Sequence, residues 1–263
     1  MHIHPLETNR MTVEMTELTV GQSLAVSKIP STLYEQQITK MLQFCVTKAI
    51  GVDADPINWT VQERYLAISH YLSCSYASDE DGEGYNFTIG NGNYFDYLDF
   101  SLNSIGSDES INIGVLGDDD WNIRHLTGAM AEAIETTVGT VDTSKTMHFL
   151  VGSMAAQLFI TGEKPPEFEL KKDLYDWIAN RIETFLAYPE RDFISLLNLF
   201  YVYRKQLNHF FDVRESHNGF VIYSTKKPLV ISDKGEVVTG LIPTRFLAIP
   251  CLTRQVTDLS RLP

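Results

Sequence analysis

An acidic segment between residues 79 and 120 most constrains how this chain can fold. It contains eleven Asp and Glu residues and no Lys or Arg, and so carries −11 of the formal net charge of −13. Carboxylates at this density repel one another unless they face water or a basic partner, so the segment is predicted to lie at a surface. The acidic residues are Asp79, Glu80, Asp81, Glu83, Asp96, Asp99, Asp108, Glu109, Asp118, Asp119 and Asp120.

Aromatic residues inside this segment predict a small β insertion over 85–116. Residues 85–89 and 94–102 alternate in polarity, and Gly90-Asn-Gly-Asn93 between them is typical of a tight turn. We expect Tyr94, Tyr97 and Phe100 to pack on one face of this hairpin. Two carboxylates on the other face, Asp96 and Asp99, are then free to meet a basic surface of another subunit. The alternative is a solvated face that only keeps the protein soluble.

The chain before residue 79 is predicted to be a short strand and helices. Residues 11–18 alternate as a half-buried strand. A helix is expected from Ser31 or Thr32 to Ala49, with Thr32 and Glu35 forming a capping box. The next helix repeats the capping box with Thr60 and Glu63. One side of that helix is apolar (Val61, Tyr65, Leu66, Ile68 and Leu72).

The helical pattern returns after the acidic segment. Helices are predicted over 126–135, 144–160, 170–187 and 190–211, and the last, apolar on several sides, is expected to be the central core helix. Two hairpins follow, over 213–223 and 229–241. The basic, proline-containing tail beyond Leu241 is expected to dock on a neighbouring subunit or on the chain's own β end, and to be dispensable for folding.

Together these patterns predict an α+β fold that is mainly α, with a helical body, a small β insertion and β-hairpins near the C-terminus. Four regions are expected. They are an N-terminal strand with helices (1–78), the acidic β insertion (79–120), a helical core (121–212), and β-hairpins with an extended tail (213–263).

Composition excludes several classes of function. A sequence pI near 4.9 argues against binding to DNA, RNA or an anionic membrane. The three cysteines, Cys45, Cys74 and Cys251, lie far apart, so neither a disulfide scaffold nor a cysteine zinc site is expected. They suit buried thiols in a reducing cytosol. No secretory signal or membrane span is expected.

The sequence offers no candidate set of catalytic, cofactor-binding or metal-binding residues. Residues 79–84 resemble the start of a calcium loop, but position 12 of that loop is Gly90 instead of the required Glu. No nucleophile elbow, phosphate loop or HExxH motif occurs. His70, His148 and His209 fall in helical patterns beside large apolar residues, where core histidines are common. We therefore predict a protein that is not an enzyme and holds no metal or cofactor.

Two short stretches carry a resemblance to a known class of proteins. A strand runs into Leu18-Thr-Val-Gly-Gln22, a short helix ends at Lys28-Ile-Pro30, and a capped helix follows; later, Tyr188-Pro-Glu-Arg-Asp-Phe193 opens a long apolar helix. The chain thus resembles tail, baseplate-hub or tail-assembly proteins of tailed bacteriophages. The resemblance implies a non-enzymatic structural subunit of a tail or baseplate that contacts other tail proteins and copies of itself. Its location would be the virion tail, and the host cytoplasm during assembly. The alternative is a cytosolic tail-assembly chaperone or adaptor.

Overall fold

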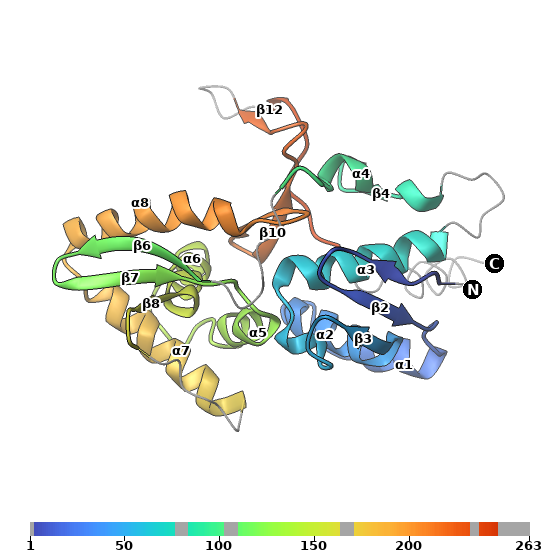
Figure 1. The fold of residues 1–263 in the computed structure, drawn as a ribbon, viewed down its shortest axis with the longest axis horizontal. Coiled ribbons are helices and arrows are strands. Elements are labelled where there is room, and N and C mark those ends of the chain that lie inside the picture. The colour runs from blue at the N-terminus through green and yellow to red at the C-terminus, as the bar shows by residue number, and fades with distance from the viewer. Residues whose placement is uncertain (1–2, 77–83, 103–109, 164–170, 232–236, 247–263) are drawn as a thin grey trace, which may run out of the picture.

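The computed structural model describes residues 3–76, 84–102, 110–163, 171–231 and 237–246. With 47% helix and 22% strand, it confirms an α+β fold that is mainly α (Figure 1). The main helices are α1 (Val20–Ser27), α2 (Tyr34–Cys45), α3 (Val61–Tyr76), α5 (Gly128–Thr136), α6 (Lys145–Gln157), α7 (Lys171–Leu186) and α8 (Glu190–Leu207). Short helical turns are η1 (Pro56–Asn58), η2 (Gly84–Asn86) and α4 (Tyr94–Tyr97).

The N-terminal part is a three-stranded antiparallel sheet beside α1 and α2. Its order is β1 (Leu6–Glu7), β2 (Thr12–Met15) and β3 (Val46–Ile50). The predicted strand at 11–18 is confirmed. The helix predicted to reach Ala49 instead ends at Cys45, because the next five residues form β3, which pairs with β2. Helix α1 carries a capping box between Thr19 and Gln22, which was not predicted.

Helices α3 and α6 form the centre of the body. Thr60 and Glu63 make the predicted capping box at the start of α3, since each backbone amide donates to the other residue's side chain. Nine of the 13 residues of α6 are buried, whereas α8 buries four of its 18. The prediction that α8 is the central core helix was therefore wrong. Its partly apolar outer side lies at the surface instead.

A second antiparallel sheet lies against α8 and joins the acidic segment to the helical body (Figure 1). Its order is β6 (Ile111–Leu116), β7 (Asp119–Ile123) and β8 (Leu158–Ile160). The predicted boundary at residue 120 falls within β7. The helix predicted over 144–160 ends three residues early because β8 pairs with β7.

Most of the predicted 85–102 hairpin takes another form. Only β4 (Thr88–Ile89) and β5 (Gly92–Asn93) pair, around a turn in which Gly90 has a φ of +59°. Residues 94–97 form α4 instead of a strand, because Asn93 and Asp96 make a capping box that starts a helical turn. Tyr94 and Tyr97 are buried as expected, but Phe100 is 75% exposed.

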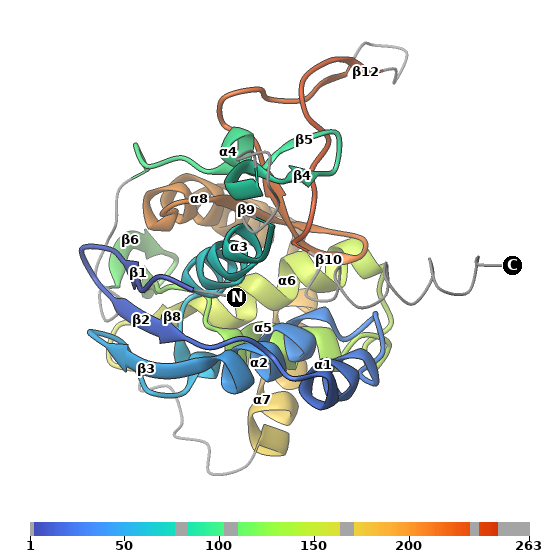
Figure 2. The same cartoon turned by 90° about the vertical axis from the view of Figure 1, so that its right-hand side faces the viewer.

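Two antiparallel hairpins follow α8, as predicted. The first joins β9 (Asp212–Ser216) to β10 (Gly219–Tyr223), and the second joins β11 (Val230–Ile231) to β12 (Val237–Thr239). The first packs on α6. The second extends away from the helical body in both views (Figures 1 and 2). Residues 225–231 and 237–241 are called the arm below.

The arm meets the acidic segment of its own chain at its base. Lys227 forms an ion pair with Asp96 at 2.8 Å, and the Thr225 hydroxyl donates to Asp99. Hydrogen bonding to Lys227 lowers the pKa of Asp96, and hydrogen bonding to Ser101 lowers that of Asp99. The expectation that these two carboxylates are free to meet another subunit is therefore corrected. Lys227 of the same chain pairs with Asp96, and the hydroxyls of Thr225 and Ser101 donate to Asp99.

Candidate functional site

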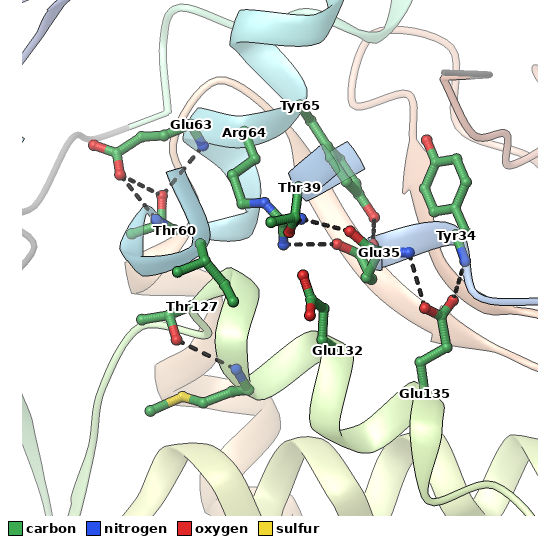
Figure 3. Close-up of polar contacts among 12 residues, drawn as sticks. Tyr34, Glu35, Thr39, Thr60, Glu63, Arg64, Tyr65, Thr127, Glu132 and Glu135 are labelled. Atoms are coloured by element: carbon green, nitrogen blue, oxygen red, sulfur yellow. Dashed lines mark hydrogen bonds and ion pairs between the residues drawn. The ribbon is translucent and has the colours of Figure 1, made fainter. Parts of the chain in front are cut away.

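A group of polar side chains lies buried where α2, α3 and α5 meet (Figure 3). At its centre Arg64 of α3, which has no exposed surface, forms an ion pair with Glu35 of α2 at 3.0 Å. Its other terminal nitrogen donates to the Glu35 carbonyl at 2.7 Å and to the Thr39 hydroxyl at 2.6 Å. The Tyr65 hydroxyl donates to the second Glu35 carboxylate oxygen at 2.5 Å. One arginine thus fixes α2 against α3.

A carboxylate from α5 caps helix α2. Glu135 accepts the backbone amides of Tyr34 at 2.6 Å and Glu35 at 2.9 Å, which are donors in the first turn of α2 (Figure 3). The predicted capping box between Thr32 and Glu35 was wrong. The N-cap position is Leu33, without a side-chain cap, and the Glu35 carboxylate faces Arg64.

Helix α5 brings a third carboxylate toward the same point. Glu132 extends toward the Arg64–Glu35 pair in Figure 3 and forms an ion pair with Lys171 at 3.0 Å. The close approach of α5 to α3 requires glycine at position 128, because a Cβ there would clash with the Arg64 guanidinium. We call Glu35, Arg64, Tyr65, Glu132 and Glu135 the buried charge cluster.

Burial dominates the electrostatics of this cluster. It raises the pKa of Glu35, while the Arg64 charge and the Tyr65 hydrogen bond oppose that rise. Burial, together with the negative charge of Glu35, also raises the pKa of Glu135 to about 8. The same desolvation holds the pKa of Tyr65 well above its usual value. Near neutral pH the cluster therefore tends to retain a proton on Glu135.

Stability should therefore fall as pH rises across the range in which Glu135 titrates. The folded protein binds a proton at Glu135 up to about pH 8, whereas the unfolded chain releases it near the ordinary value of 4.5. Between these values each pH unit costs at most about 1.4 kcal/mol from this group. We expect Glu135→Gln to make the decline in unfolding free energy from about pH 5 to about pH 8 shallower, as measured by urea titration. The control Glu7→Gln makes the same substitution at an exposed residue outside the buried charge cluster, and equal slopes in both variants would contradict the assignment.

A second buried group surrounds the start of α3. The Thr60 hydroxyl lies 2.9 Å from Nε2 of His209, and Glu63 pairs with Arg10 at 2.9 Å. Burial lowers the pKa of His209 to about 4, so this ring is neutral at physiological pH. His148 is also buried and hydrogen-bonded to the Ile134 carbonyl at 2.8 Å. The prediction that these two histidines belong to the core is confirmed.

Both groups can orient helices, but their geometry offers no reactive centre. Thr60 is 1% exposed, and its hydroxyl donates to the Glu63 carboxylate within the capping box. Two thiols are buried, and burial raises the pKa of Cys45 to about 12, which disfavours the nucleophilic thiolate. Cys251 and residues 79–83 of the calcium-like stretch lie outside the described residues. Within the described ranges no group of three or more His, Cys, Asp or Glu side chains is arranged to hold a metal ion.

Comparisons with known proteins identified no relative of this chain. A scan against protein-family models, a search of curated proteins and a search of solved structures each found no match to the chain. Among the helices in the described part of the chain, none has both the length and the apolarity needed to cross a bilayer.

Proposed function

We propose that this protein is a non-enzymatic structural subunit of a bacteriophage tail or baseplate, and that it works through contacts with other tail proteins. The observation that carries the proposal is the arm, a two-stranded hairpin that extends from the body (Figure 2) and exposes the apolar side chains of Val230 and Ile231. Such an element suits a protein that is completed by its neighbours. The sequence resemblance to tail and baseplate proteins is the reason for proposing a phage tail or baseplate as the assembly.

The outer part of the arm has features of a strand pair that another molecule covers. Val230 is 46% exposed and Ile231 is 56% exposed. Successive residues of a strand point to opposite faces, so both faces of β11 present an apolar side chain to solvent. An isolated two-stranded hairpin is marginal in water and gains stability when a further strand or surface packs on it. A neighbouring subunit would provide that surface.

The base of the arm is fixed to the body. The Leu241 amide donates to the Lys227 carbonyl at 3.0 Å, and the Ile242 amide donates to the Asn91 side chain at 2.8 Å. The Ser224 hydroxyl donates to the Asp96 carbonyl at 2.6 Å. These contacts hold the arm in one orientation before it meets a partner, which lowers the entropy lost on docking.

Helix α1 adds a second surface suited to contacts. Its eight residues carry no charge, and Val26 is its one buried residue. Val20 is 65% exposed and Leu24 is 50% exposed, one helical turn apart on the same face. Two outward apolar surfaces on one chain fit a subunit with more than one neighbour, including further copies of itself.

The alternative function is a tail-assembly chaperone or adaptor whose acidic face holds a basic client. Two carboxylates of that face, Asp96 and Asp99, already bind the arm of the same chain. The ion pair between Lys227 and Asp96 reduces the negative charge that the face can offer to a client. Mass spectrometry of purified particles separates the two functions, because a structural subunit is retained in the mature virion and a chaperone is not.

A charge placed on the arm should block incorporation without unfolding the protein. Val230→Lys together with Ile231→Lys puts two ammonium groups on a surface that we expect to be buried in the assembly. We expect an unchanged unfolding free energy and at least about a tenfold loss of the protein from purified particles, because about 1.4 kcal/mol of contact energy corresponds to tenfold in occupancy. Val115→Lys is the matched control, since Val115 is 69% exposed on β6, away from the arm. Normal incorporation of the double variant would contradict a docking role for the arm.

A further inference from the structure

A small cavity lies where α3 meets the C-terminal ends of α6 and α8. The centre of a water molecule can occupy about 10 Å³ there. Gln62, Gln157 and Asn208 line it together with apolar side chains that include Val61 and Val213. This volume is close to the smallest that holds one water molecule, so any ligand larger than water is excluded.

Two lining side chains bring unsatisfied hydrogen-bond acceptors to this cavity. Gln62 is 8% exposed and Gln157 is 3% exposed. The Oε1 atom of each is buried and accepts no hydrogen bond from the described residues. A buried amide oxygen without a donor is costly, and native proteins commonly satisfy such groups with an ordered water.

The orientation of both amides is fixed by their other partners. Nε2 of Gln157 donates to the Arg124 carbonyl at 2.8 Å, and a carbonyl can only accept. On the other side, Nδ2 of Asn208 donates to the Asp212 carboxylate at 3.1 Å, which turns Oδ1 of Asn208 toward Gln62. Nε2 of Gln62 donates to that oxygen at 3.3 Å. Each glutamine therefore keeps its oxygen for another donor.

We propose that this cavity binds one structural water molecule, which donates its two hydrogens to Oε1 of Gln62 and Oε1 of Gln157. The water would connect α3 to the end of α6 beside the C-terminal end of α8. A cation fits the site poorly, because the lining residues include no Asp or Glu and do include Arg204. An anion fits poorly because the two unsatisfied atoms are acceptors. A neutral molecule that donates two hydrogens satisfies both.

The test counts long-lived waters in the full chain by oxygen-17 relaxation dispersion. Val213→Ile adds a methylene group to the lining and should displace the water, whereas Val151→Ile enlarges a buried residue of α6 that does not line the cavity. We expect the Val213 variant to lose one long-lived water relative to the unmodified protein, and the Val151 variant to lose none.

A crystal structure that resolves ordered water provides the second measurement and needs no variant. We expect density within hydrogen-bond distance of both glutamine oxygens. The proposal fails if that position is empty in the crystal, or if the unmodified protein and the Val213 variant hold the same number of long-lived waters. If Val213→Ile does not fold, the crystal structure of the unmodified protein decides.

Discussion

Replacement of Arg64 by methionine should destabilise the protein by about 3–5 kcal/mol, as expected when one partner of a buried ion pair is removed. Arg64 has no exposed surface, and its guanidinium contacts Glu35 and Thr39 on α2. Methionine is apolar and similar in length, so the substitution mainly leaves the buried Glu35 carboxylate without its ion-pair partner. Urea unfolding monitored by circular dichroism measures the loss. A variant that does not accumulate as folded protein agrees with the upper end of this range.

Two further variants separate charge from packing. In Arg64→Met combined with Glu35→Gln no buried carboxylate is left without its partner, so part of the lost stability should return. Lys48→Ala breaks an exposed ion pair with Glu14 and should cost about 0–1 kcal/mol. A cost for Arg64→Met as small as that of the Lys48 control would show that the buried charge cluster does not hold α2 against α3.

Local sequence signals predicted the helical body well where residues close together in the sequence determine the structure. The capping box at Thr60 and Glu63 and the apolar side of α3 depend on residues three and four apart, and both were confirmed. The β9–β10 hairpin was also confirmed, because the predicted turn at His217-Asn218-Gly219 places His217 and Asn218 between the strands and Gly219, with a φ of +111°, at the start of β10. In these cases the periodicity and the turn chemistry agree with the tertiary structure.

Errors arose where a distant segment changed the outcome. Thr32 and Glu35 form a capping pattern in the sequence, but Arg64 binds Glu35, and Glu135 from α5 supplies the cap. Val46–Ile50 continued a helical pattern, yet β2 offers it a strand partner. Glu35 is 29 residues from Arg64 and 100 residues from Glu135, and patterns of residues three and four apart do not identify partners at such distances.

The buried charge cluster was missed for the same reason. Glu35, Arg64, Glu132 and Glu135 lie on three helices, and each alone resembles an ordinary exposed helix residue. Gly128 within a helix start was the one local sign of a close approach, since glycine there admits the Arg64 side chain. A search for helical positions where a charge falls on the apolar stripe would have indicated Glu35 and Arg64.

The C-terminal region shows the largest difference between expectation and structure. Residues beyond Leu241 were expected to dock on the chain's own β end or on a neighbour and to be dispensable for folding. The first of these is confirmed for the described residues, because Thr244 pairs with Ile222 and Arg245 donates to the Phe220 carbonyl at 2.9 Å. Phe246, however, is completely buried in the core, which conflicts with the expectation that the tail is dispensable for folding.

Phe246 is the centre of an aromatic group that joins four parts of the chain. Its ring lies 5.4 Å from that of Phe211, 5.8 Å from Tyr94 and 6.4 Å from Tyr65, measured between ring centroids. The Tyr34 hydroxyl donates to its backbone carbonyl. These partners come from α2, α3, α4 and the residue that precedes β9, so one late residue closes a core that the first half of the chain begins.

Phe246→Ala should therefore cost about 3–5 kcal/mol of unfolding free energy, the range for removing a buried phenylalanine ring. The loss combines the transfer of the ring from the core with the cavity left among its aromatic neighbours. Phe100→Ala is the matched control. It removes the same side chain from a site that is 75% exposed and should change stability by no more than about 0.5 kcal/mol. Equal effects of the two substitutions in urea unfolding would mean that the chain folds without this residue. A large difference would mean that any truncation before Phe246 tests folding as well as assembly.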